Sequence, residues 1–380
     1  METVYLDNSA TTKVCDTAKQ NFLYAIENCW GNPSALYKAG MDSERLIEKA
    51  RALISAKLHC REEEIFFTGC GTESNNTALF TAAEARKKRG KRIVTSAVEH
   101  PSVSKVCDEL EARGFEIIRL PVGSDGRVSV KDIEAAVNED TILVSLMAVN
   151  NETGAVMPIE AVKPAIEKAG NNAIFHCDAV QAFGKLPIDV KKLGIDMLSA
   201  SGHKLHAPKG IGFLYKSKDI HLKPYLFGGG QEKGQRSGTQ SVELIHALSG
   251  AVSELPPENI QIEKMKSLNS FAREKLSEIG GITFNSPENA LPYILNFSVE
   301  GIRSETMLHF LEADGIYVSS GSACSKGKPS SVLKAMGISS DRADSAIRVS
   351  MSRYTTEEDI VNLALGIEKA SKRLMKKSRR

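Results

Sequence analysis

The 380-residue sequence has no strong excess of charge and no long apolar segment. Lysine and arginine together number 49 against 47 for aspartate and glutamate, so a formal net charge of +2 indicates neither nucleic acid nor an anionic membrane surface as a partner. No apolar run approaches the roughly 20 residues of a membrane-spanning helix, and the N-terminus lacks the apolar core of a signal peptide. We therefore expect a cytoplasmic protein that binds neither nucleic acid nor membranes directly.

Paired cysteines are also missing. Seven cysteines are scattered along the chain without a Cys-x-x-Cys pair, which argues against a disulfide framework or a structural zinc site. His203 and His206 lie three residues apart, but in a loop with glycine and proline and without a neighbouring carboxylate, so we expect no metal ion. Most of the thiols are expected to be reduced and buried.

Apolar runs and amphipathic stretches alternate through the first two thirds of the chain. The runs that predict strands are 65–68, 92–96, 116–121, 141–149, 173–178, 197–201 and 210–215. Amphipathic stretches that predict helices fall between several of them. Alternation of this kind predicts an α/β fold with a mostly parallel seven-stranded sheet flanked by helices.

A second domain is predicted from the composition change near residue 255. Beyond it, a long amphipathic stretch precedes a second set of predicted strands, near 282–286, 293–299, 316–320 and 346–352. A chain of this length exceeds the size at which one core usually stops growing. We expect a large domain at 13–255, and a smaller α+β domain formed by 1–12 together with 256–380.

Lys204 follows the predicted strand 197–201 in a setting of small residues. Its neighbours include Ser201 and His203, and a glycine-rich turn comes after it. A lysine in such a place can form a Schiff base with a carbonyl cofactor. Taken alone, the same pattern also fits a surface lysine in a turn.

Other polar residues follow the neighbouring predicted strands. Asp178 ends one strand, where a carboxylate can keep a pyridine nitrogen protonated or cap a helix. Gly71 and Thr72 begin a helix after a glycine-rich turn, a weak signal for a phosphate site by itself. His100 and Asn151 also follow strands, although a histidine before proline is more often structural. Since the carboxyl ends of parallel strands share an edge, we expect these side chains to lie together.

Cys324 belongs to a segment rich in glycine, serine and lysine, 319–329. It is the one cysteine that we expect to be exposed, in a flexible loop, and Lys326 and Lys328 would favour its thiolate. An exposed thiol can also be incidental. The segment is not a P-loop, because Pro329 stands where a magnesium-binding serine or threonine is required.

Ten motifs in order resemble the cysteine desulfurases of the NifS/IscS type, within the fold-type I enzymes that use pyridoxal 5'-phosphate (PLP). The resemblance covers nearly the whole chain and rests on segments 5–12, 31–34, 71–74, 99–100, 149–152, 178–181, 201–204, 236–239, 319–324 and 348–353. It implies a fold-type I transferase with PLP as cofactor, L-cysteine as substrate, a homodimer, and a sulfur-acceptor protein as partner.

The resemblance also implies a role for each matching residue. Lys204, Cys324 and His100 would be catalytic, with Lys204 carrying the cofactor and Cys324 taking the substrate sulfur as a persulfide. Asp178 would pair with the pyridine nitrogen and Gln181 would contact the ring hydroxyl. The implied cofactor-binding residues are Gly71, Thr72, His100, Asn151, Asp178, Gln181, Ser201, His203, Lys204 and, from the other subunit, Thr239. The residues implied to orient the substrate carboxylate are Asn32, Asn151 and Arg353.

The acceptor and some alternatives stay open. The segment after Cys324 is slightly shorter than in the better-known bacterial members, and their longer C-terminal tail is absent. The acceptor could therefore belong to iron–sulfur cluster assembly or to tRNA thiolation. Alternative functions are a selenocysteine lyase, a fold-type I aminotransferase in which Cys324 has no role, and a non-catalytic binding module. The intact set of Lys204, Asp178, His100 and Cys324 argues against the last.

Overall fold

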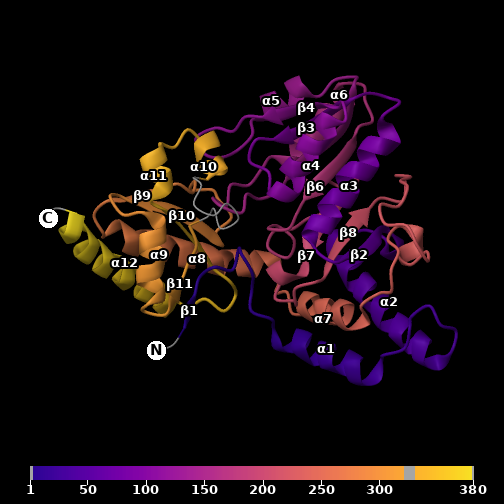
Figure 1. The fold of residues 1–380 in the computed structure, drawn as a ribbon, viewed down its shortest axis with the longest axis horizontal. Helices are drawn as coiled ribbons and strands as arrows, with labels where there is room; N and C mark the ends of the chain where they lie inside the picture. The colour runs from indigo at the N-terminus through magenta and orange to yellow at the C-terminus, as the bar shows by residue number, and fades with distance from the viewer. Residues whose placement is uncertain (1–2, 321–329, 379–380) are drawn as a thin grey trace.

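The computed structural model describes residues 3–320 and 330–378 of the chain. Figure 1 shows two regions side by side, a larger one built around a broad sheet and a smaller one that carries the long C-terminal helix. The predicted nucleophile Cys324 lies outside the described residues.

A seven-stranded sheet organises the larger region. Its strands are β2 (Ile65–Thr68), β3 (Arg92–Ser96), β4 (Glu116–Leu120), β5 (Thr141–Met147), β6 (Ile174–Asp178), β7 (Met197–Ser201) and β8 (Gly212–Lys216). They lie in the order β2-β8-β7-β6-β5-β3-β4, and only the two pairs that involve β8 are antiparallel. The predicted mostly parallel seven-stranded sheet is therefore confirmed. All strands except β8 point the same way, so their carboxyl ends form one edge.

Both faces of this sheet are covered. Ile93 of β3 packs in one buried cluster, whereas the next residue, Val94, belongs to the cluster on the opposite face. Strand side chains alternate in this way, and strands buried on both faces give near-continuous apolar runs in the sequence. The helices of the larger region are α1 (Asp16–Asn28), α2 (Lys38–Leu58), α3 (Gly71–Arg86), α4 (Pro101–Ala112), α5 (Val130–Ala136), α6 (Val162–Lys168) and α7 (Val242–Ser253).

The smaller region combines a short antiparallel sheet with helices. In the sheet, β10 (Ile294–Val299) pairs with β12 (Ala346–Ser350) on one side and with β9 (Ile282–Phe284) on the other. The helices are α8 (Glu258–Ser277), α9 (Ser304–Glu312), α10 (Ser331–Ala335), α11 (Ser340–Asp344) and α12 (Glu357–Ser378). The α12 helix packs on α8 and α9, which gives this region its own buried interior.

The N-terminal segment crosses between the two regions. Its strand β1 (Val4–Tyr5) pairs in parallel with β11 (Ile316–Tyr317) of the smaller region, and Asp7 forms a bridge with Ser350. A few residues later, the backbone N–H of Thr12 donates to the carbonyl of His203 at 2.9 Å, just beyond β7. Residues between these contacts are therefore held at the carboxyl edge of the large sheet.

Three further findings concern the described residues as a whole. Six of the cysteines are free: Cys15, Cys29, Cys60, Cys70, Cys107 and Cys177. No three histidine, cysteine, aspartate or glutamate side chains within 3–320 and 330–378 come together as a metal site. Within the same ranges, none of the helices is long and apolar enough to span a membrane.

Candidate active site

A cavity of about 330 Å³ opens at the carboxyl edge of the parallel strands. Its volume falls in the range typical of small-molecule sites. Nine of the predicted site residues line it: Gly71, Thr72, His100, Asn151, Asp178, Gln181, Ser201, His203 and Lys204. The structure thus brings together side chains that follow five different strands.

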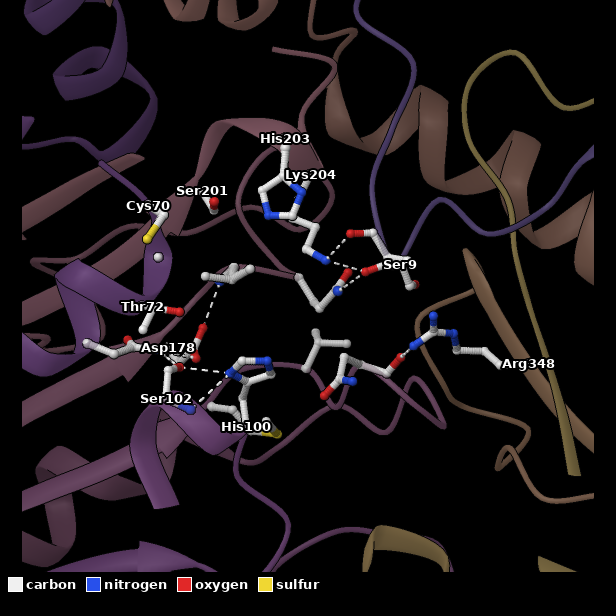
Figure 2. Close-up of a pocket in the computed structure, with 18 residues that line it drawn as sticks. Ser9, Cys70, Thr72, His100, Ser102, Asp178, Ser201, His203, Lys204 and Arg348 are labelled. Carbon is white, nitrogen blue, oxygen red and sulfur yellow. Dashed lines mark hydrogen bonds between the residues drawn. The ribbon is translucent and has the colours of Figure 1, made fainter. Parts of the chain in front are cut away.

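Lys204 stands directly after β7, at the end of a short 3-10 turn, Gly202–Lys204. Its amine donates to the backbone carbonyls of Ser9 and Ala10, the latter at 2.8 Å, and Figure 2 shows it pointing at Ser9 across the cavity. The N-terminal segment therefore holds the lysine amine at the cavity. An amine held at this place can react with a carbonyl compound that enters the cavity.

Asp178 presents a buried carboxylate at the end of β6. Burial raises its pKa, while hydrogen bonds from the Val180 N–H to Oδ1 (3.0 Å) and from Asn75 Nδ2 to Oδ2 (2.7 Å) favour the charged form. The positive charge of Lys204 favours it further. A buried carboxylate beside a cavity is best compensated by a cationic group of a ligand.

His100 caps α4 with its side chain and faces the cavity. The backbone N–H of Ser102 donates to Nδ1 at 3.1 Å, so Nδ1 carries no proton. Burial lowers the pKa of the imidazole, which is therefore neutral with its proton on Nε2. Asn75 donates to the Ser102 hydroxyl at 2.8 Å and to Asp178, so one amide connects the supports of both side chains.

The part of the cavity beside the start of α3 is suited to an anion. Gly71 starts α3, and a Cβ atom there would lie 2.7 Å from Val180 and 3.3 Å from Ser201, so only glycine fits without displacement. Helix N–H groups of this first turn are unpaired within the helix and favour negative charge. The buried Ser201 hydroxyl has no hydrogen-bond partner among the described residues. Burial and neighbouring lysines lower the pKa of His203 to about 4, so it is neutral.

Arg348 of β12 lines the same cavity, although we did not predict a role for it. Its guanidinium donates to the Asn151 carbonyl at 3.0 Å and to Asp7 Oδ1 at 2.7 Å, and it is only 3% exposed. Its Nε has no partner in the described part of the chain. A buried cation therefore faces the cavity from the smaller region, as Figure 2 shows.

Two predicted carboxylate ligands lie elsewhere. Arg353 binds the backbone carbonyl and the carboxylate of Glu254, at 2.6 and 2.7 Å, and does not line the cavity. Asn32 is exposed, and its side chain accepts from the Ser34 N–H at 2.9 Å within a turn. The structure therefore brings neither side chain to the cavity of its own subunit.

Thr239, predicted to act in the other subunit's site, is exposed and does not line this cavity. Its segment is tied to the start of α3, since Arg236 donates to Glu73 at 2.8 Å. Cys70 does line the cavity, which we did not predict, whereas Cys324 lies outside the described residues. Two thiols must therefore be distinguished by experiment.

The family model described as "Aminotransferase class-V" matches residues 4–363. The fold and the site agree with that match, because a lysine after β7 and a buried aspartate after β6 face one cavity. The chain therefore belongs to the class-V aminotransferase family.

Several relatives within this family are named as cysteine desulfurases or as NifS-like proteins. "Cysteine desulfurase IscS" of Methanosarcina thermophila is 42% identical, over 94% of this chain and 89% of the relative. A solved structure titled "NIFS-LIKE PROTEIN" has a TM-score of 0.90 at 38% identity, covering 97% of this chain and 99% of that one. Another, "SspA in complex with cysteine", has a TM-score of 0.83 at 34% identity, covering 93% and 99%. The NifS/IscS resemblance is thereby confirmed.

Enzymes of this family use PLP, and PLP is the cofactor of this chain. The residues fit it in three respects. A lysine amine is at hand for the cofactor's aldehyde, a buried carboxylate is available for its ring nitrogen, and the unpaired Ser201 hydroxyl and the close backbone of Gly71 suit its phosphate. The fold-type I assignment is confirmed with it.

Proposed function

We propose that this protein converts L-cysteine to L-alanine and keeps the sulfur as a persulfide on Cys324. The observation that carries the proposal is the convergence of Lys204, Asp178 and Arg348 on one cavity, in a chain of the NifS/IscS type. The reaction balances without an added oxidant. The substrate's S–Cβ bond breaks, Cβ gains a proton to become the methyl group of alanine, and the Cys324 sulfur bonds to the released sulfur.

Bound PLP supplies an electron sink for the substrate Cα. The chain's own residues position it and move protons. Asp178 would balance the positive ring nitrogen, and Lys204, held over the cavity by Ser9 and Ala10, can take up and return a proton at its amine. His100, neutral with a proton on Nε2, can donate that proton to a sulfur or oxygen atom in the cavity.

Arg348 is our candidate for the substrate carboxylate, in place of Arg353. The contacts with Asn151 and Asp7 use one N–H of Nη1 and one of Nη2, and the second N–H of each nitrogen would be the donor for a carboxylate. The guanidinium of Arg353 instead donates to the backbone carbonyl and the carboxylate of Glu254. Because Arg348 is buried, a charge-assisted hydrogen bond from its guanidinium to a carboxylate would be stronger than one in water.

Cys324 is supported as the nucleophile by the residues that flank its segment. On one side Ser319 exchanges backbone hydrogen bonds with Arg348, which lines the cavity. On the other side Ser330 donates its hydroxyl to Glu152, the residue after Asn151. Both flanks of 321–329 therefore start next to the substrate's expected place.

A homodimer is part of the proposal. Large apolar side chains are nearly fully exposed on the larger region: Trp30 is 78% exposed, Leu36 96% and Phe227 78%. Exposed apolar groups of this size favour an interface. Phe227 lies in the same stretch as Thr239, so a partner that covers one would meet the other, in line with a threonine shared across the interface.

Neighbouring functions remain as alternatives. A selenocysteine lyase would use the same cavity, and the relative turnover of cysteine and selenocysteine separates the two. An aminotransferase would not need Cys324. The acceptor, either an iron–sulfur scaffold or a tRNA thiolation enzyme, and the cytoplasmic location stay predictions.

The test compares the wild type with Cys324→Ser. L-cysteine is added with a reductant, and alanine and sulfide are measured together with the visible spectrum of the cofactor. We expect Cys324→Ser to bind cysteine, seen as a spectral change, but to release sulfide at least about 100-fold more slowly, because only a sulfur nucleophile attacks sulfur efficiently here.

Cys60→Ser is the matched control. Cys60 is partly exposed, but burial and the nearby Glu64 raise its pKa to about 12, so it is a poor nucleophile far from the cavity. The Cys60→Ser variant should release sulfide at the wild-type rate. Undiminished release by Cys324→Ser would refute the proposed nucleophile, above all if Cys70→Ser lost it instead.

A further inference from the structure

Lys185 is a buried lysine next to the active site that the proposed mechanism does not use. It is 9% exposed and lies seven residues after Asp178, in the turns that follow β6. Burial lowers its pKa to about 7, with a further contribution from the charges of Lys204 and Arg348. A methionine would occupy such a place at lower cost in free energy, so a lysine here calls for an explanation.

The Lys185 amine donates to Gln181 Oε1 at 3.1 Å. The same glutamine donates from Nε2 to the carbonyl of Ser9 at 3.0 Å. The Ser9 carbonyl can only accept, so it requires the amide nitrogen on its side, and a charged Lys185 amine, which can only donate, requires the amide oxygen on the other side. Lys185 and the Ser9 carbonyl therefore favour the same orientation of the Gln181 amide, and Lys185 adds to it on the oxygen side.

The orientation matters because Gln181 lines the cavity, whereas Lys185 does not. Lys185 lies behind it, along a separate small cavity of about 30 Å³ shared with Lys204. Since Ser9 takes only one of the two Nε2 hydrogens, the other remains for a ligand acceptor. With the amide reversed, an oxygen would face the same acceptor and repel it.

We propose that Lys185 is a positioning residue for PLP, which acts by holding the Gln181 amide with its N–H toward the cofactor's ring oxygen. The proposal rests on the Gln181 contact that the family resemblance implies, and goes beyond it by naming what sets the polarity of that contact. It does not depend on which thiol carries the sulfur.

The experiment is a double-mutant cycle on the full-length holoenzyme. The wild type, Lys185→Met, Gln181→Met and the double variant are diluted, and the rate of PLP loss is followed by the visible absorbance of the bound cofactor. We expect Lys185→Met to lose PLP about tenfold faster, the equivalent of one net hydrogen bond. In the Gln181→Met background the same change should add nothing, because the two residues then act as one unit.

Lys216→Met is the matched control. Lys216 is also 9% exposed, its pKa is also lowered by burial, and its amine donates to the Ile220 carbonyl at 2.8 Å. It lies on β8 outside the cavity lining, so its PLP loss should match the wild type. Thermal unfolding checks that each variant folds, and Lys185→Leu replaces Lys185→Met if the latter does not.

Two outcomes would overturn the proposal. One is PLP loss by Lys185→Met at the wild-type rate. The other is an equal acceleration in the presence and absence of Gln181, which would mean that Lys185 acts on its own. Because cofactor loss is measured without L-cysteine, a failure here is distinct from a failure of the desulfurase assignment.

Discussion

Glu99 is a buried carboxyl group that supports the cavity without lining it. Its Oε1 accepts from the Ser96 hydroxyl at 2.7 Å and from the N–H of Met147 at 3.0 Å, and Met147 does line the cavity. Its Oε2 has no partner among the described residues. Burial raises the pKa of this carboxyl to about 8, so it is mostly protonated at neutral pH.

The prediction for Glu99 follows from that protonation. Above the unfolded pKa of about 4.3, folding requires the group to take up a proton, so its effect on stability becomes less favourable as pH rises toward about 8. Glu99→Gln needs no proton and should hold or raise Tm at pH 7, with the difference shrinking toward pH ~4. Glu99→Ala should cost about 1–3 kcal/mol by leaving the Met147 N–H unpaired.

Differential scanning calorimetry of the three proteins from pH 4 to 8 tests this. A Glu99→Gln variant that is strongly destabilised at pH 7 would mean that Glu99 is ionised in the folded protein, and would refute the prediction.

Single residues also mark the limit of sequence reasoning. Lys204, Asp178 and His100 were found because each follows a strand, and the edge of a parallel sheet gathers such positions. Asn75 and Ser102 lie inside the first turns of α3 and α4, where nothing local separates them from ordinary helix residues. Arg348 lies in the motif 348–353, where the resemblance implies a role for Arg353 and names none for Arg348, whose place at the cavity depends on how the two regions pack.

At the scale of elements, the strands of the large sheet were predicted to within about two residues. They are buried on both faces, so their apolar runs are continuous and end sharply at polar or glycine residues. The reversal of β8 could not be read in the same way. Its sequence is as apolar as that of its neighbours, and its direction follows from the length of the connection after β7 and not from its composition.

The start of α3 provides a prediction at this scale. A Cβ at Gly71 would meet Val180 at 2.7 Å, and Val180 donates its N–H to Asp178. Gly71→Ala should therefore weaken PLP binding by at least about tenfold while costing about 1–3 kcal/mol of stability. Gly280→Ala, where a Cβ meets nothing within 4 Å, is the control. Equal PLP titration curves for both variants would contradict the close approach proposed for the cofactor's phosphate.

At the scale of the whole molecule, the site is formed where the two regions meet. Ser9 comes from the N-terminal segment and Arg348 from β12, whereas Asp178 and Lys204 come from the large sheet. Relative motion of the regions would therefore change the distance between Arg348 and Lys204. The sequence predicted site residues in both parts of the chain, but it gave no role to Ser9 or Arg348, whose positions at the cavity depend on how the two regions pack.

The homodimer is tested at the same scale. Sedimentation velocity should give a dimer at micromolar concentration, because Trp30, Leu36 and Phe227 would otherwise stay in water. Replacing Phe227 by aspartate should shift the equilibrium toward monomer and speed PLP loss, since Thr239 would no longer reach the partner's site. A wild-type monomer that retains PLP would contradict the shared site.

The most direct measurement of the central claim is the mass of the peptide that contains Cys324 after a single incubation with L-cysteine, without reductant. The account predicts the mass of one additional sulfur atom on that peptide, no such gain on the peptide with Cys70, and none on either peptide when Lys204 is replaced by alanine. Sulfur found on Cys70, or alanine formed while Cys324 gains no sulfur, would contradict it.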